Sequence, residues 1–112
     1  MMSDRWIPLA ELAKWFEQVP GGFQAKQELK SVARFEVGDL LRVRPKRAAY
    51  DLVLCRNTVI YFTEEVRDAL HARLVESLRP GGYLIVGTSE RVADPRRLGL
   101  SSPFHFIYRK DR

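Results

Sequence analysis

The sequence YDLVLC at residues 50–55 is almost continuously apolar, and YLIVG at residues 83–87 has the same character. A strand that is covered on both faces has this composition, so residues 50–55 are predicted to be a central strand and residues 83–87 a second buried strand. Between them, apolar residues recur at spacings of three and four, which is typical of a helix with one apolar face. The order strand, helix, strand predicts a βαβ unit with parallel strands and a right-handed crossover. The apolar residues of the helix are Val66, Ala69, Leu70, Leu74 and Leu78.

The predicted crossover helix has signals at both ends. Thr63 is a good N-cap residue, and Glu64 and Glu65 place negative charge in the first turn, where the helix dipole favours it. The sequence Pro80-Gly81-Gly82 is predicted to end the helix before the second strand begins.

The flanking segments are predicted from shorter patterns. Residues 1–22 are expected to form a leading helix and turn, in which Pro20-Gly21-Gly22 stops the helix. Residues 27–31 have weak helical character, residues 33–37 alternate as a short strand does, and residues 104–108 alternate as a final strand does. The apolar stripe of the leading helix is Leu9, Leu12, Ala13, Phe16 and Val19.

Length and composition indicate one folded domain over residues 1–112. The chain is 46% hydrophobic and 29% charged, as ordinary globular proteins are. Its longest apolar runs are far shorter than the ~20 residues that span a bilayer, and no charged-then-apolar leader opens the chain. We therefore expect a cytoplasmic protein that does not insert into a membrane.

The inventory of reactive side chains is small. Cys55 is the one cysteine, so an internal disulfide is excluded, and His71 and His105 are too far apart in sequence to indicate a metal site with it. Cys55 is expected to be a buried packing residue. His71 is expected at the surface or its boundary, and His105 is assigned no role.

The net charge of +5 includes a basic run at residues 42–47. Such a run could meet an acidic partner or nucleic acid. The run contains Pro45 and no aromatic side chain on which a base could stack, which favours a solvated loop. Nucleic acid binding is therefore the less favoured interpretation. The basic residues are Arg42, Arg44, Lys46 and Arg47.

Polar residues follow three of the predicted strands, at Asp39-Leu40, Arg56-Asn57 and Thr88-Ser89-Glu90. Ligands of open parallel sheets bind outside the carboxyl ends of the strands, so these three segments together favour a small-molecule site. Each segment taken alone also has a structural explanation. Asp39 could cap a turn, Arg56 could pair with a surface carboxylate, and Asn57 could bond to its own backbone.

The sequence closely resembles the CheR family in two stretches, YDLVLCRNTVIYF at residues 50–62 and LRPGGYLIVGTSE at residues 78–90. CheR enzymes are S-adenosylmethionine-dependent methyltransferases that act on glutamate side chains of bacterial chemotaxis receptors. The resemblance covers residues 15–110 and is most specific in the run CRNxxIYF. It implies an α/β fold with a partial Rossmann-like methyltransferase sheet, made of the βαβ unit and a C-terminal strand. It also implies S-adenosylmethionine as cofactor and S-adenosylhomocysteine as product.

Carried over residue by residue, the resemblance implies that Arg56 and Asn57 contact the cofactor near its ribose and methionine portions. Tyr61 would line the methyl-transfer site. The Asn-Leu pair that frames the adenine in the family falls on Asp39 and Leu40. Asp39 departs from this pattern, because a carboxylate offers only acceptors where an amide offers donors and acceptors. Thr88 also stands where the family often has histidine.

The family's Gly-rich cofactor loop, its ribose-binding acidic residue and its N-terminal strands and helical domain have no equivalent in this sequence. The isolated pair Gly21-Gly22 follows a predicted helix and not a strand, so it is not such a loop. The resemblance therefore implies the C-terminal half of a methyltransferase domain, truncated and carrying half of the cofactor site. The alternative is a noncatalytic interaction module that retains this half-fold.

Two partners are considered. One is a methyl-accepting chemotaxis receptor or a similar protein acceptor. The other is a second copy of the chain, because the absent strands would leave apolar strand edges exposed. We expect either that the strand ending at Asp39 pairs directly with the strand at residues 50–55, or that the chain dimerises across the exposed edge.

Overall fold

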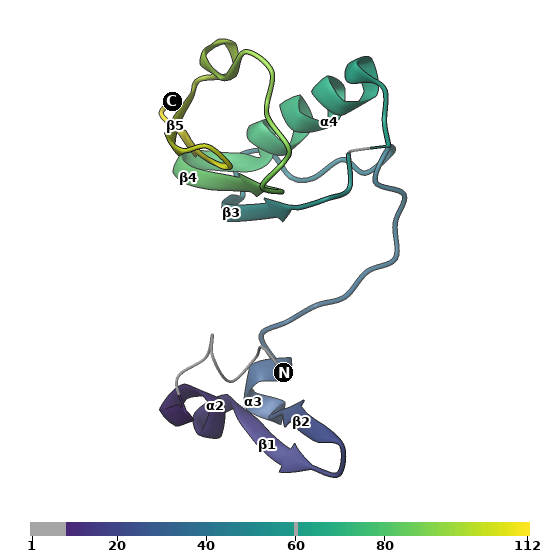
Figure 1. Ribbon diagram of the computed structural model, residues 1–112, viewed down its shortest axis with the longest axis vertical. Helices are drawn as coiled ribbons and strands as arrows, with labels where there is room; N and C mark the ends of the chain where they lie inside the picture. Colours follow the sequence, from purple (N-terminus) through teal and green to yellow (C-terminus); the bar gives the residue numbers. More distant parts are fainter. Residues whose placement is uncertain (1–8, 60) are drawn as a thin grey trace. The chain divides into compact units, whose positions relative to one another are not determined.

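The computed structural model describes residues 9–59 and 61–112. These residues separate into two compact units, with the boundary between Val37 and Gly38 (Figure 1). The single domain over residues 1–112 stays a prediction, and each unit is described by itself. The part of the leading-helix prediction that falls on residues 1–8 lies outside the described residues.

The second unit has a mixed α/β architecture, with helix α4 packed on one face of a four-stranded sheet (Figure 1). The strand order is β3-β4-β6-β5, in which β3 and β4 are parallel and the other neighbours are antiparallel. The predicted parallel βαβ unit is therefore confirmed, and the fold is consistent with part of a methyltransferase sheet. Its elements are β3 (Tyr50–Cys55), α4 (Glu64–Ser77), β4 (Leu78–Val86), the 3-10 helix η1 (Pro95–Leu98), β5 (Leu100–Phe104) and β6 (Ile107–Lys110).

Helix α4 begins where the sequence predicts. The Thr63 hydroxyl accepts a hydrogen bond from the Val66 N–H at 3.3 Å, and this satisfies one of the free N–H groups of the first turn. The buried side of the helix packs against the sheet and forms the core of this unit. That core contains Leu70, Leu74 and Val75 of α4 with Leu78, Leu84 and Val86 of β4 and Tyr108 of β6.

The prediction that Pro80-Gly81-Gly82 separates helix from strand is wrong. The helix ends at Ser77, and these three residues lie inside β4. Tyr50 pairs with Leu78 and Leu52 pairs with Tyr83. Four residues of β4, 79–82, are therefore opposite the single residue Asp51 of β3. Gly81 has a φ of +87°, which favours glycine, and the segment forms an irregularity within the strand.

Strand β3 lies at an edge of the sheet, so the prediction of a central strand covered on both faces is wrong. Val53 and Cys55 face the core beneath α4. Leu52 and Leu54, on the opposite face, are 52% and 63% exposed. The strand is apolar on both faces, but the helix of this unit covers only one of them.

The prediction of a single final strand at residues 104–108 is also wrong. Strands β5 and β6 form an antiparallel hairpin, with Phe104 paired to Ile107 and a turn at His105 and Phe106. The Ser102 hydroxyl donates to the Phe104 carbonyl at 2.5 Å, next to this turn. The aromatic alternation at residues 104–108 thus arises across a turn and not along one strand.

The described part of the first unit consists of a short helix, a β-hairpin and a helical turn. The helix ends at Trp15, so the prediction that it continues to residue 19 is wrong. Pro20 and Gly21 form the loop of the hairpin, and Gly21 has the positive φ of +89° that the third residue of a type II turn requires. The weak helical character predicted at residues 27–31 is confirmed. The elements are α2 (Leu9–Trp15), β1 (Phe16–Val19), β2 (Gly22–Ala25) and α3 (Gln27–Lys30).

Residues 33–37 form no strand, so that prediction is wrong. Phe35 is 94% exposed and Val37 is fully exposed, and none of the described strands pairs with this segment. A lone extended segment is not stable as a strand without a neighbour. The expected direct pairing of a strand ending at Asp39 with residues 50–55 is therefore absent from the described residues.

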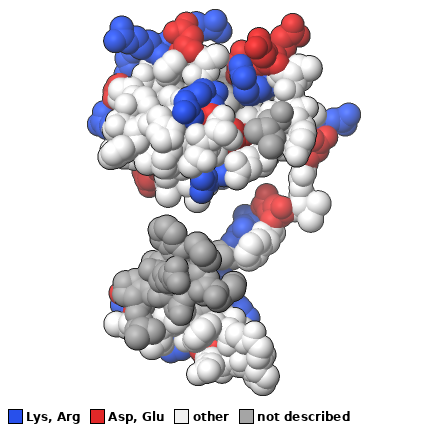
Figure 2. All heavy atoms as spheres, viewed as in Figure 1, with Lys and Arg blue, Asp and Glu red and all other residues white. Residues whose placement is uncertain are grey.

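The basic run at residues 42–47 lies in an irregular loop, and its four basic side chains are exposed, as expected for a solvated loop. On the face of the second unit seen in Figure 2, Lys and Arg side chains lie beside Asp and Glu side chains. Within the described ranges, no helix has the length and apolar composition needed to cross a membrane.

Candidate site at the carboxyl edge of the parallel strands

Two of the three predicted polar segments come together at one edge of the sheet. Arg56 and Asn57 follow β3, and residues 87–90 follow β4. Because Cys55 pairs with Val86, the two segments leave the sheet side by side. The structure therefore brings these segments together as the parallel βαβ topology predicts.

The carboxylate of Glu90 connects the two segments. It accepts hydrogen bonds from the backbone N–H of Gly87 at 2.6 Å, of Asn57 at 2.7 Å and of Val59 at 3.2 Å. Glu90 is only 4% exposed. Burial by itself would raise the pKa of Glu90, but the hydrogen bonds from Asn57, Gly87 and Val59, with His71 nearby, hold that pKa below its ordinary value. Glu90 is therefore an ionised, buried carboxylate.

Asn57 has a left-handed backbone conformation with φ +59°, which asparagine tolerates better than most residues. Its side-chain oxygen lies against Gly87, and a Cβ at Gly87 would collide with Asn57 Oδ1 and with Glu90 Oε1. The neighbouring Arg56 donates from Nε to the Val86 carbonyl at 3.3 Å. Both candidate cofactor residues are thus held against the end of β4, and their side chains are exposed.

Asp39 and Leu40 have a different environment from the one predicted. Asp39 follows no strand; its carboxylate accepts from the Leu41 N–H at 3.0 Å and lies 3.6 Å from Arg42 Nε. Leu40 packs against the core, and its carbonyl accepts from Arg73 Nη2 at 3.2 Å. Asp39 therefore caps its own turn, which is the structural explanation considered for it. A cofactor role for these two residues stays a prediction.

In the sequence, Cys55 precedes the Arg56-Asn57 loop and Tyr61 follows it. Tyr61 is 88% exposed, and its role at a methyl-transfer site stays a prediction. Cys55 is buried, as expected, and its Sγ lies 3.0 Å from Thr58 Oγ1. A thiol in this position packs the base of the loop.

His71 is only 1% exposed, so the prediction of a surface or boundary position is wrong. Burial lowers its pKa, Arg67 adds to this effect, and Glu90 and Asp68 oppose it. Neither ring nitrogen has a hydrogen-bond partner among the described residues. The spacing of His71 with Leu74, Val75 and Leu78 is that of one helix face, and this is the signal in the sequence that would have indicated its burial.

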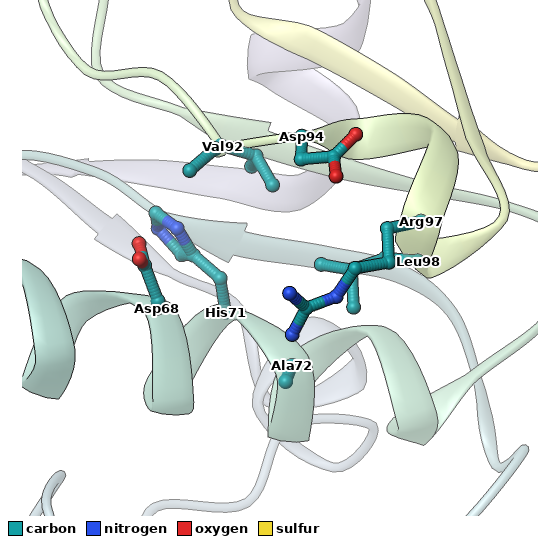
Figure 3. Close-up of a pocket in the computed structure, with 8 residues that line it drawn as sticks. Asp68, His71, Ala72, Val92, Asp94, Arg97 and Leu98 are labelled. Atoms are coloured by element: carbon teal, nitrogen blue, oxygen red, sulfur yellow. The ribbon is translucent and has the colours of Figure 1, made fainter.

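His71 lines a pocket between α4 and the segment after β4 (Figure 3). The pocket walls are partly apolar, and the described residues contain no cluster of three metal-ligating side chains. The remaining lining residues are Asp68, Ala72, Val92, Ala93, Asp94, Arg97 and Leu98.

Residues 3–103 match the family model described as "CheR methyltransferase, SAM binding domain". The chain belongs to the CheR family. This confirms the resemblance drawn from residues 50–62 and 78–90, and it identifies the carboxyl-edge segments as part of a domain type that binds S-adenosylmethionine.

Curated relatives of the chain are named as methyltransferases, of chemotaxis proteins in two cases below and of biofilm formation in the third. The chain is 36% identical over 88 residues to the chemotaxis protein methyltransferase of Listeria innocua, covering 79% of this chain and 33% of that protein. It is 36% identical over 87 residues to chemotaxis protein methyltransferase 1 of Pseudomonas aeruginosa, covering 77% and 32%. It is 29% identical over 99 residues to the probable biofilm formation methyltransferase WspC of P. aeruginosa, covering 85% and 24%. The chain thus spans about a third or less of the length of these curated relatives.

The family implies S-adenosylmethionine as the cofactor. The donor set at the edge fits part of that molecule, because the Arg56 guanidinium and the Asn57 amide suit a carboxylate and hydroxyl groups. Both side chains are exposed on a backbone that Glu90 holds in place. Asp39 is not part of this donor set, because its carboxylate is bonded within its own turn.

The buried His71 should make the stability of the protein depend on pH. Because the pKa of His71 is lowered from 6.5 in the folded state, the His71 ring binds a proton more tightly in the unfolded chain than in the folded one. The contribution of His71 to stability is complete above the unfolded pKa and is lost as pH falls below it. We expect the urea midpoint of the parent to decrease between about pH 7.5 and about pH 5.5.

The variant His71→Leu should show a smaller decrease over the same interval, measured by urea unfolding at each pH. The exposed His105 offers a matched control, and His105→Leu should keep the pH dependence of the parent. An unchanged pH dependence in His71→Leu would contradict the assignment.

Proposed function

We propose that this chain contributes Arg56 and Asn57 to the S-adenosylmethionine site of a CheR-type protein-glutamate methyltransferase. The single observation that supports this most strongly is the position of the Arg56-Asn57 loop. It lies at the carboxyl edge of two parallel strands and is held there by Glu90 and by the end of β4. Relatives that are named chemotaxis protein methyltransferases support a protein of chemotaxis as the acceptor. We take the methylated group to be a glutamate side chain of a chemotaxis receptor, as the resemblance to the CheR family implies.

The chemistry needs few catalytic groups. When bound, the cofactor supplies an electrophilic methyl group on a sulfonium, and the products are a glutamate methyl ester and S-adenosylhomocysteine. A glutamate side chain with a pKa of about 4.3 is already ionised at neutral pH, so no general base is required. The tasks left to the protein are orientation and the exclusion of water. We assign orientation of the cofactor to Arg56 and Asn57, and the lining of the methyl-transfer site to Tyr61.

A second candidate function is a noncatalytic interaction module with the same half-fold. Two observations favour it. The chain spans about a third of the length of its chemotaxis relatives, and the carboxylate of Asp39, at the position assigned to adenine, is bonded within its own turn. Cofactor binding and methyl transfer distinguish the two functions.

Cofactor binding is tested by calorimetric titration of S-adenosylmethionine, and separately of S-adenosylhomocysteine, into the chain. We expect saturable binding with a Kd below about 1 mM. The variant Asn57→Gly removes the amide while keeping a residue that tolerates the left-handed backbone, so it should weaken binding by at least about tenfold.

The control for this titration is Gln24→Ala, which removes an exposed amide from the first unit and should bind as the parent does. A parent that releases no saturable heat, or an Asn57→Gly variant that binds equally well, would refute the proposed cofactor site.

Methyl transfer is tested with a receptor cytoplasmic fragment and cofactor that carries a radiolabelled methyl group. The enzyme function predicts label in a base-labile ester on receptor glutamates. Asn57→Gly should lower the rate at which this ester forms, because the variant binds the cofactor more weakly. Cofactor binding by the parent without any labelled ester would favour the noncatalytic module.

We also propose that a second copy of the chain pairs with the edge of β3 on which no strand of the described residues lies. This strand is terminal in the sheet, and beside its edge lies an exposed apolar face formed by Tyr50, Leu52 and Leu54, with Tyr83 paired to Leu52. An edge strand next to an apolar face is a template for further pairing. A second copy presents the same edge, which permits a twofold arrangement.

Light scattering coupled to size-exclusion chromatography should give twice the mass of the chain. Leu54→Lys places a charge on the exposed face of β3 and should give the mass of one chain. Phe35→Lys adds the same charge at an exposed apolar residue outside the sheet, and it should leave the mass unchanged. A parent with the mass of one chain at all concentrations would rule out this self-association.

A further inference from the structure

We infer that Glu90 is a positioning residue for the cofactor loop, holding Arg56 and Asn57 through the loop backbone without touching the cofactor itself. The inference rests on the function proposed above for those two residues. In the sequence, Glu90 stands out only as part of the polar segment Thr88-Ser89-Glu90 after a predicted strand. The inference gives this residue a specific role.

The Glu90 carboxylate is buried, and every hydrogen bond that it makes is to a backbone N–H group. Oε1 accepts from both Asn57 and Gly87, and Oε2 accepts from Val59. The Glu90 N–H itself donates to the Gly87 carbonyl at 2.9 Å, which closes a tight turn over residues 87–90. The side chain is thus folded back into the protein and away from solvent.

The loop requires an acceptor at this place. Strand β3 ends at Cys55, so the N–H groups of Asn57 and Val59 have left the hydrogen-bonding ladder. Buried N–H groups without acceptors are costly, by about 1–3 kcal/mol for each group. Asn57 adds a left-handed backbone conformation, which non-glycine residues adopt only when their surroundings hold them there.

The chemistry of the acceptor matters as well as its position. A carboxylate has only acceptor sites, and hydrogen bonds to an ionised acceptor are stronger than neutral ones. Among the described residues, no Lys, Arg or His forms an ion pair with Glu90, so backbone N–H groups carry most of the stabilisation of its charge. Glutamine would place an NH₂ group toward N–H donors and could not satisfy all three.

Glycine at position 87 belongs to the same arrangement. Because a Cβ there would meet both Asn57 Oδ1 and Glu90 Oε1, Gly87 lets the carboxylate and the Asn57 amide approach the backbone together. Gly87→Ala therefore perturbs the carboxylate at Oε1, which accepts from Asn57 and Gly87, and Glu90→Gln perturbs the same carboxylate by replacing it.

The experiment combines two measurements on Glu90→Gln. Amide hydrogen exchange followed by NMR should become faster at Asn57 and Val59 by at least about tenfold, while the β4–β6 ladder at Leu84 keeps the parent rate. Titration with S-adenosylmethionine should give an affinity lower by at least about tenfold. A merely structural role would accelerate exchange throughout the unit and not selectively in this loop.

Gly87→Ala should give the same selective pattern and serves as the second variant if Glu90→Gln does not fold. The control is Glu76→Gln, an exposed carboxylate on α4, which should leave exchange and affinity at the parent values. If the parent binds no cofactor, the failure belongs to the proposed function, and selective exchange in the variants still supports the positioning of the loop. Parent-like exchange at Asn57 and Val59 in both variants would overturn the inference.

Discussion

The buried carboxylate of Glu90 is the constraint on which the candidate site depends. An isolated carboxylate in a protein interior is strongly unfavourable, so this one persists because three backbone N–H groups solvate it. Two of these groups come from the loop after β3 and one from the end of β4. The same bonds that stabilise the charge therefore join the two strand ends, and the exposed side chains of Arg56 and Asn57 extend from a backbone with one defined conformation.

The rest of the second unit supplies the rigid base for this arrangement. Helix α4 packs Leu70 and Leu74 on the face of the sheet that carries Leu84 and Val86. The opposite face of β3 stays exposed at Leu52 and Leu54. A sheet with one covered face and one bare apolar face is consistent with a chain that matches about a third of its relatives' length. The parallel pair β3-β4 and the hairpin β5-β6 are consistent with part of a methyltransferase fold.

Much of the candidate site could be predicted from the sequence, and the exceptions have physical reasons. Arg56 and Asn57 follow an apolar strand directly, so the rule for parallel sheets places them at the carboxyl edge. Asp39 was placed there by a short alternating segment, residues 33–37, which has no neighbour to pair with among the described residues. The role of Glu90 was not visible, because a hydrogen bond to an N–H 33 residues earlier in the chain leaves no local pattern.

Local chemistry determined the elements whose signals lie within one turn or one strand. Thr63 caps α4, and the continuous apolar runs form the parallel pair β3 and β4. Contacts between distant segments decided where the chain reverses and which surfaces are buried. The alternation at residues 104–108 continues through a hairpin turn, and the stripe of the leading segment passes from helix into strand at Phe16. Periodicity records which side chains can share a face, but burial depends on what packs against that face; His71 is buried because the segment after β4 covers it, whereas Leu54 stays exposed because the helix packs on the other side.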